Sequence, residues 1–222
     1  MRFVFFVATI LSLSACNFNI TPTFYIRDIQ DVISDKQNIE IPIFIKLPAS
    51  DVDSCNSEIG QVIGILDTYG IDATLQSCSA DENNLFATAN VEFTASVVYS
   101  ETSQVKNFKG IVGLIVDEAG DGVYYLNLQA NPNLPKAMSD IEGALIFATL
   151  DASQVGFIIT LNNDTRRSVT FNIYASFVNG VATDYNTFEL GPRSELEVRA
   201  SDVGANLFFN RGWFGLGDFT NN

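Results

Sequence analysis

The stretch LFATANVEFTASVVY, residues 85–99, has the clearest pattern in the chain. Every second residue from Leu85 to Tyr99 is apolar, and most of the residues between them are polar. Successive side chains of a β-strand point to opposite faces, so this alternation predicts a long strand with one buried and one solvated face. The other elements are predicted outward from this strand.

The residues before this strand predict two helices and two shorter strands. Residues 26–33 and 50–70 have apolar side chains at helical spacing, whereas 39–48 (IEIPIFIKLP) and 71–78 are typical of strands. Proline donates no hydrogen bond to a neighbouring strand, so Pro42 limits its strand to a sheet edge or an irregular position.

The residues after it predict a hairpin and then a series of short strands. Residues 108–116 and 123–129 form the expected hairpin, and 131–141 is expected to be a loop with at most one helical turn. From residue 143 onward, short apolar segments alternate with turn signals and no helical stretch intervenes. This spacing predicts a small antiparallel sandwich.

The predicted fold class is α+β and mainly antiparallel β, with an N-terminal α+β part packed on a C-terminal β-sandwich-like part. The expected units, in chain order, are a signal peptide at 1–15, a lipid-anchored tether at 16–23, an α+β domain with one disulfide at 24–141 and a β-sandwich-like domain at 142–222.

Composition excludes several classes of function. The chain has 26 acidic and 12 basic residues and a net charge of −14, which argues against nucleic acid as a partner. It has no histidine, so Ser-His-Asp and Cys-His nucleophiles and His-ligated zinc are excluded. A hydrophobic content of 47% is typical of a folded domain rather than a disordered chain.

The first fifteen residues, MRFVFFVATILSLSA, are typical of a secretory signal. Arg2 precedes an apolar run that is too short to span a bilayer, which needs about 20 apolar residues. The run ends in Leu13-Ser14-Ala15-Cys16, which resembles the lipobox of bacterial lipoproteins. An ordinary signal peptide, cut after Ala15 and leaving a free Cys16, is the alternative.

The resemblance implies cleavage before Cys16, a thioether-linked diacylglycerol on its sulfur, and an acyl chain such as palmitate on the new amine. Two or more acyl chains give stable anchoring. By the sorting pattern of enterobacterial lipoproteins, Asn17 implies the outer membrane. Because the acidic body would be repelled by anionic lipid, we expect the covalent lipid to be the membrane contact.

Two cysteines remain after the one assigned to lipid, and an even remainder in an exported protein predicts one disulfide. Cys55 lies on the apolar stripe of the helix expected at 50–70, and the strand expected at 71–78 returns Cys78 toward the start of that helix. Two unpaired buried thiols are the alternative.

Three further motifs are better explained by structure than by ligand binding. The segment DEAGDG (117–122) has calcium-type ligands but lacks the spacing of an EF-hand loop, and a hairpin needs such residues. Asp51 and Asp53 are expected to cap the following helix. Arg166 and Arg167 could grip an anion but fit a solvated turn.

No catalytic residue, metal ligand or cofactor is predicted. Glycoside hydrolysis needs only two carboxylates, but nothing singles out a pair among 26 acidic residues. A Ser/Lys arrangement would need a desolvated lysine, and the lysines lie in polar segments or on expected strand edges.

The aromatic, glycine-rich tail from residue 207 has three interpretations. Its rings fill the core, form a platform for a sugar or protein partner, or contact a membrane. The rings concerned are Phe208, Phe209, Trp213, Phe214 and Phe219.

The first half of the body resembles short bacterial and phage-associated lipoproteins of unknown function. The resemblance is carried, besides the lipobox, by Asp28-Ile29-Gln30, Ile41-Pro42, Cys55 and Cys78. It implies no catalytic residues and favours a phage or prophage origin.

The expected function is therefore that of a non-enzymatic outer-membrane lipoprotein that binds an envelope protein. In a phage-encoded protein, this would be surface modification or superinfection exclusion. Two alternatives remain, namely carriage of an apolar ligand in a groove along the strand 85–99 and carboxylate-based hydrolysis of an envelope glycan. The oligomeric state stays open.

Overall fold

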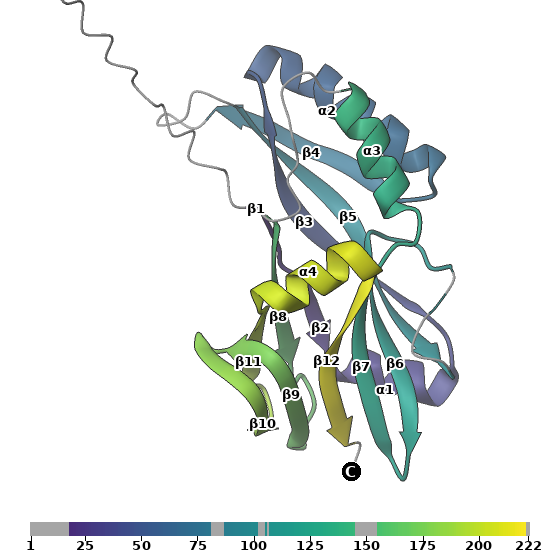
Figure 1. Ribbon diagram of the computed structural model, residues 1–222, viewed down its shortest axis with the longest axis vertical. Coiled ribbons are helices and arrows are strands. Elements are labelled where there is room, and N and C mark those ends of the chain that lie inside the picture. Colours follow the sequence, from purple (N-terminus) through teal and green to yellow (C-terminus); the bar gives the residue numbers. More distant parts are fainter. Residues whose placement is uncertain (1–17, 81–86, 102–104, 106, 145–154, 221–222) are drawn as a thin grey trace, which may run out of the picture.

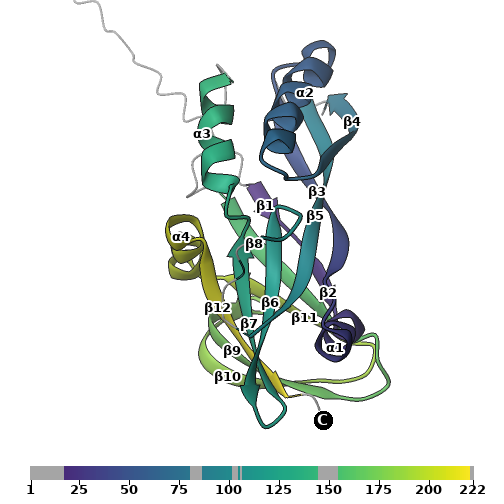
Figure 2. The same ribbon diagram turned by 90° about the vertical axis from the view of Figure 1, so that its right-hand side faces the viewer.

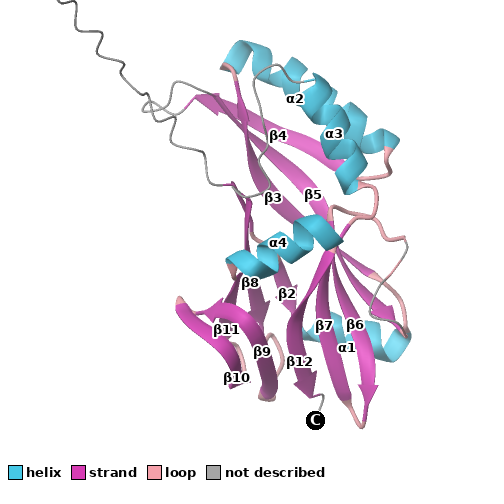
Figure 3. Cartoon of the chain, viewed as in Figure 1, coloured by secondary structure: helices cyan, strands magenta, loops and turns pink. Residues whose placement is uncertain are grey.

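One hydrogen-bonded sheet dominates the computed structural model, which describes residues 18–80, 87–101, 105, 107–144 and 155–220 (Figures 1 and 3). The described helices are α1 (Ile26–Asp35), α2 (Val52–Thr68), α3 (Leu134–Ala144) and α4 (Asp202–Arg211). The strands are β1 (Phe18–Ile20), β2 (Thr23–Tyr25), β3 (Ile39–Ala49), β4 (Ala73–Ala80), β5 (Ala87–Ser100), β6 (Val112–Gly120), β7 (Val123–Ala130), β8 (Val155–Asn162), β9 (Val169–Val178), β10 (Val181–Leu190), β11 (Glu195–Ala200) and β12 (Trp213–Thr220).

The sheet is mixed and curls into a near-barrel. Its strand order is β1-β8-β11-β9-β12-β7-β6-β5-β3, with β2, β10 and β4 added beside β8, β9 and β5. The pairs β1–β8, β2–β8 and β5–β6 are parallel, and the other pairs are antiparallel. Its two end strands, β1 and β3, approach each other, as Figure 2 shows. The fold class is thus α+β with a predominance of β structure.

The central prediction is confirmed by β5. Its alternate residues from Ala87 to Val97 are all buried, whereas Thr88, Asn90 and Glu92 on the other face are partly exposed. The strand that contains Pro42, β3, ends the sheet order and, among the described strands, pairs only with β5, so the proline lies at an edge as expected.

The helix α2 packs the apolar stripe that the sequence predicted, and its N-terminus is capped as expected. Asp51 is the N-cap residue, and its Oδ1 accepts a hydrogen bond of 2.8 Å from the Ser54 backbone N–H. Cys55, fully buried on the stripe, forms a disulfide with Cys78 of β4, with the two Cα atoms 6.3 Å apart.

Two helices lie where the sequence analysis expected a loop or strands. The segment 131–141 includes most of α3, whose first residue donates its N–H to the Asn131 carbonyl, and Pro135 lies in the first turn, where proline is tolerated. The helix α4 is capped by Ser201, which accepts from Gly204 N at 3.2 Å, and it ends at Gly212 in the left-handed conformation.

The β-sandwich expected from residue 142 is not confirmed. Strands of the C-terminal part pair with strands of the N-terminal part, β8 with β1 and β2, and β12 with β7. The two parts therefore share one sheet and are joined by main-chain hydrogen bonds rather than by a face-to-face contact of two sheets. Much of the strand expected at 143–150 lies outside the described residues.

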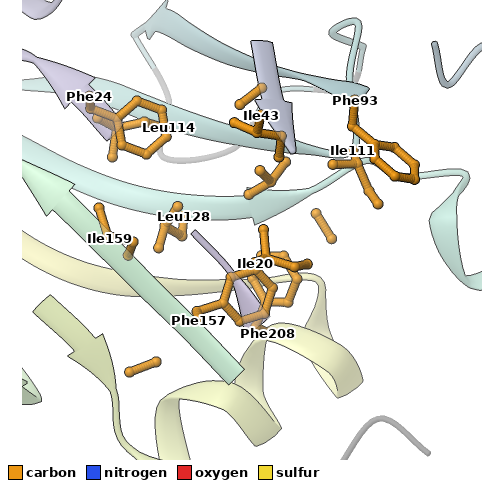
Figure 4. Packing of buried hydrophobic residues seen from close by; sticks show 14 of the residues in the cluster. Ile20, Phe24, Ile43, Phe93, Ile111, Leu114, Leu128, Phe157, Ile159 and Phe208 are labelled. Atoms are coloured by element: carbon orange, nitrogen blue, oxygen red, sulfur yellow. The ribbon is translucent and has the colours of Figure 1, made fainter. Parts of the chain in front are cut away.

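A single buried apolar cluster fills the near-barrel and extends under α2. In Figure 4, Phe157 of β8 packs on Phe208 of α4, and the ring centroids are 4.2 Å apart. The remaining labelled residues include Ile20 and Phe24 from the first two strands, so both ends of the chain contribute to the same core.

Candidate functional site

The candidate site lies on the outer face of four neighbouring strands, β7, β12, β9 and β10. On the inner face, Phe219 of β12 lies 5.5 Å from Tyr124 of β7 and 5.7 Å from Phe171 of β9, measured between ring centroids. Neighbouring residues of a strand point to opposite faces. The residues next to these three, which point outward, are Tyr125, Asp218 and Asn172.

Strand register extends this outward group into a cluster that we call the tyrosine face. Asp218 pairs with Tyr125 on one side and with Asn172 on the other. Across β9 and β10, Asn172 pairs with Thr187, and Tyr174 pairs with Tyr185. The members of the tyrosine face are Tyr125, Asn172, Tyr174, Tyr185, Thr187 and Asp218.

The carboxylate of Asp218 is the centre of the tyrosine face and is only 8% exposed. Its Oδ1 accepts a 2.7 Å hydrogen bond from Asn172 Nδ2, and its Oδ2 accepts from the Tyr174 hydroxyl. The Asn172 Oδ1 in turn accepts from Thr187 Oγ1 at 2.7 Å. These donors are neutral, so they orient the carboxylate without cancelling its charge.

The hydroxyl of Tyr174 stays protonated at neutral pH. Burial raises the pKa of Tyr174, and the hydrogen bond to Asp218 and that group's negative charge raise it further. Its ring stacks on Tyr185, with 5.6 Å between centroids and 15° between planes. The Tyr174 side chain is therefore fixed at both its ring and its hydroxyl.

Two rings of the tyrosine face remain available to solvent, because Tyr125 is 45% and Tyr185 is 63% exposed. Phe177, further along β9, is also exposed, and the Arg199 guanidinium lies 6.0 Å from its ring centroid. Exposed aromatic rings on a rigid sheet, interleaved with hydrogen-bonding groups, are typical of the central residues of protein interfaces.

The same outer face is covered at the other end of β6 and β7. Gln129 of β7 makes two hydrogen bonds to the main chain of Val105, and the Phe108 ring lies over Gly113, where a Cβ would be 3.1 Å from the ring. Val105 and Phe108 thus cover this part of the outer face of β6 and β7, and the face is open around Tyr125.

The predicted structural motifs lie apart from the tyrosine face. Residues 117–122 form the end of β6 and the turn of the β6–β7 hairpin, where Asp121 and Gly122 both have positive φ, as a tight hairpin requires. In the described part of the chain, no group of three or more Cys, Asp or Glu residues could hold a metal ion. Asp53 lies in the first turn of α2, where an acidic residue is favourable.

The two arginines expected in a turn, Arg166 and Arg167, are exposed between β8 and β9. The neighbouring Asp164 instead pairs with Arg27 of α1, with 3.5 Å between Nε and Oδ2. The lipidation residue, Cys16, and the signal peptide 1–15 lie outside the described residues.

Three of the five C-terminal aromatic residues fill the core, which confirms that interpretation for Phe208, Phe214 and Phe219. Phe209 and Trp213 are partly exposed. The glycine-rich tail from residue 207 consists of the second half of the helix α4 followed by β12.

The apolar face of β5 does not line an open groove in the described structure. Its residues from Ala87 to Val97 belong to the same buried cluster as the α2 stripe formed by Cys55, Ile59, Val62 and Leu66. The side chains of α2 and of the near-barrel therefore occupy the space in which an apolar ligand was expected.

Sequence reasoning missed the tyrosine face because its six members come from three separate parts of the chain, namely β7, the β9–β10 hairpin and β12. One signal was present in the sequence, because Asp218 is the only charged residue in the aromatic run WFGLGDF. The structure then shows that this aspartate is nearly buried. Nothing local identified Asn172 and Tyr174 as its partners, because they precede Asp218 by 46 and 44 residues.

Comparisons with known proteins give a family but no named relative. The family model described as "Domain of unknown function (DUF7424)" matches residues 18–220. No curated protein and no solved structure matches the chain. Among the described helices, none has the length and apolar character needed to cross a membrane.

Proposed function

This chain belongs to the family described as Domain of unknown function (DUF7424), and we propose that it is a non-enzymatic outer-membrane lipoprotein that binds a protein of the bacterial envelope. The observation that carries the proposal is the tyrosine face, in which exposed Tyr125 and Tyr185 flank a carboxylate held by Asn172 and Tyr174. Tyrosines fixed in place lose little conformational entropy on binding, which favours affinity for a protein surface.

The lipid on Cys16 would hold this body close to the membrane. Residues 18–20 form β1, and Thr23 begins β2, so much of the segment 16–23 expected as a tether belongs to the sheet. Only Asn17 then separates the lipidated residue from β1. A partner bound by this protein would accordingly be a component of the envelope itself.

The first experiment tests the anchor. Intact-mass spectrometry of protein extracted from bacterial membranes should show loss of residues 1–15 and the added mass of diacylglyceryl and acyl groups. A Cys16→Ser variant is the control and should carry neither addition. An unlipidated mature protein with a free Cys16 would contradict the anchored form of the proposal.

The second experiment tests the binding face in cells. A photo-reactive benzoylphenylalanine is placed at Tyr125 or at Tyr185, and the matched control position is Val203 of α4, which is 68% exposed. We expect a discrete adduct with an envelope protein from the two tyrosine positions and none from Val203. The same adducts from all three positions, or none from Tyr125 and Tyr185, would contradict the proposal.

Surface modification by a phage-encoded protein is the most specific version of this function. Cells that express the full chain would be challenged with phages that use different receptors, beside cells that express a Tyr125→Ala, Tyr185→Ala variant. Resistance that depends on the two tyrosines supports this version. Unchanged infection across the receptors would overturn it while leaving the binding function to the cross-linking experiment.

A further inference from the structure

The strand β10 has a free edge next to the tyrosine face. It pairs with β9 along its whole length, Val181–Leu190, and with no other strand in the described residues. Leu190 is its only buried residue, and Val181 and Tyr185 are 68% and 63% exposed. A ten-residue strand is long for an unpaired edge.

Two observations show which main-chain groups of β10 point away from β9. The Thr187 N–H donates to the side-chain oxygen of Asn186 at 2.9 Å. Asn172 pairs with Thr187 and directs its main-chain carbonyl toward β12. The oxygen of that carbonyl would lie 2.0 Å from a Cβ on Gly217. Paired residues of antiparallel strands either both face each other or both face away, so Thr187 presents its main-chain groups at the edge.

The same alternation places the main-chain groups of Tyr185 and Glu189 at this edge, because the β9–β10 register is continuous from 185 to 190. The sequence VATDYNTFEL is rich in strand-forming residues and contains no proline, lysine or arginine. Natural edge strands are usually protected against pairing by such residues or by bulges. The outward main-chain groups of Tyr185 and Glu189 bond to no other strand in the described residues, and an added strand would displace the Asn186 side chain from the Thr187 N–H.

The charge of β10 selects the kind of partner. Its only charged side chains are two exposed acids, Asp184 and Glu189, which are five residues apart and therefore lie on opposite faces of the strand. Opposite charges on neighbouring strands are favourable, and like charges are unfavourable. A second copy of this chain would bring the same acids and a net charge of −14 to the edge, which favours a basic partner.

We propose that the free edge of β10 accepts an extended segment of a protein partner, carrying lysine or arginine, as an additional antiparallel strand. This inference rests on the proposed function, because it states the chemistry of the envelope protein that is bound. Side chains of the added strand that lie on the outer face would stand next to the exposed Tyr185 ring, where a cation is also attracted to the ring face.

The test uses a peptide probe and the mature chain with Cys16→Ser. The probe is KTVKTVKTV, whose lysines alternate between the two faces of a strand as the two acids of β10 do, and the matched control is ETVETVETV. Amide NMR spectra and hydrogen exchange are recorded with each peptide. We expect KTVKTVKTV to bind, more tightly at low than at high salt, and to slow exchange of the Tyr185, Thr187 and Glu189 amides.

Two variants, each with a matched control, separate strand addition from general attraction to an acidic protein. Thr187→Pro removes an outward N–H without removing a main-chain hydrogen bond to β9, and Thr187→Val is its control because it keeps that N–H. The pair Asp184→Lys, Glu189→Lys reverses the charge of β10. The matched charge control is Asp31→Lys, Glu197→Lys, at exposed positions on α1 and β11.

Both Thr187 variants lose the hydroxyl that bonds Asn172, so the comparison between them isolates the main-chain N–H. We expect Thr187→Pro to bind the peptide at least tenfold more weakly than Thr187→Val, and the charge reversal of β10 to bind it at least tenfold more weakly than the matched charge control. Failure of KTVKTVKTV to bind, or protection that is not concentrated on the outward amides, would overturn the inference. The inference would also be overturned if the chain formed a dimer and Thr187→Pro dissociated it, because a second copy would then occupy the edge. If these tests fail while cross-linking from Tyr125 persists, the proposed function stands without strand addition.

Discussion

At the scale of single residues, the outer face of the sheet depends on a carboxylate that is nearly buried. Asp218 obtains its hydrogen bonds from Asn172 and Tyr174, which belong to a different strand, so these bonds also join β12 to β9. An isolated buried charge is costly, and donors that satisfy it recover much of that cost. The same contacts that shape the binding face therefore contribute to stability.

Replacing Tyr174 by phenylalanine should reduce the free energy of unfolding by about 1–2 kcal/mol at pH 7, because Asp218 loses one donor. Urea unfolding measures this change, and Tyr25→Phe at an exposed position is the control. Loss of less than a few tenths of a kcal/mol would mean that water replaces the hydroxyl without cost.

The pH dependence of the same variant has a definite sign. The pKa of Tyr174 is raised in the folded protein above its ordinary value near 10, so the protonated hydroxyl stabilises the fold below about pH 10. That contribution is lost as the pH rises toward the folded-state pKa. The wild type should accordingly lose more stability than Tyr174→Phe between pH 9 and 11, and equal slopes would contradict this account.

Gly217 is required by the close approach of two strands. A Cβ on this residue would lie 2.0 Å from the carbonyl oxygen of Asn172, which is main chain and cannot move aside. Gly217→Ala should therefore cost about 3 kcal/mol or more. The control is Gly64→Ala in α2, where nothing lies within 4 Å, and there we expect a gain of roughly 0.5–1 kcal/mol.

At the scale of elements, α2 is held at both ends, by the sheet at one and by α3 at the other. The Cys55–Cys78 disulfide joins its first turns to β4, and near its other end Tyr69 donates a 2.6 Å hydrogen bond from its hydroxyl to Asp140 of α3. Figure 1 shows α2 and α3 together at the end of the molecule opposite α1. This end is joined to the rest of the fold through β3 and β5 and, by way of α3, through β7.

Removing the disulfide with Cys55→Ala and Cys78→Ala should lower the free energy of unfolding by about 3 kcal/mol, since the closed loop spans 23 residues. Chemical denaturation measures the change, and the wild type in the presence of reductant should behave in the same way. A wild type that is unaffected by reductant, with the bond shown to be broken, would contradict the stabilising role.

At the scale of the whole molecule, the two sequence halves depend on each other. The strand β12 lies between β7 and β9, so it completes the sheet on both sides, and β8 pairs with β1 and β2 from the start of the described chain. Each half by itself would expose strand edges and part of the shared core.

We therefore expect one cooperative unfolding transition. The single tryptophan, Trp213, reports on β12 by fluorescence, and circular dichroism reports on the whole sheet; the two curves should coincide. A fragment of residues 18–141 should not fold. Separate transitions, or a folded fragment, would show that the halves are independent domains.

Local patterns in the sequence were sufficient for several parts of the fold. Alternation defined β5, helical spacing defined α1 and α2, and Pro42 placed β3 at an edge. These features depend on the residue's own backbone and its near neighbours, so a single stretch of sequence contains them. The even number of cysteines that remain after Cys16, and their positions on the expected helix and strand, were also enough to predict the Cys55–Cys78 pair.

The helices α3 and α4 were not identified because each contains or adjoins a residue that usually marks a turn. In α3 this residue is Pro135, which lies in the first turn, where proline is permitted. In α4 it is Gly212, which is the C-cap. The helix signals around Ser201 and Gly212 were obscured by the aromatic residues between them. A local pattern is ambiguous where the same residue type can either end a helix or belong to one.

By itself, the sequence determined the alternation of β5, the helical stripes and the pairing of the two cysteines, because each is set by local spacing. Only the tertiary structure decided that both halves share one sheet and that Asp218, Asn172 and Tyr174 meet on its outer face. The physical reason is that strand order and register are set by hydrogen bonds and packing between segments far apart in the chain, which no local pattern records.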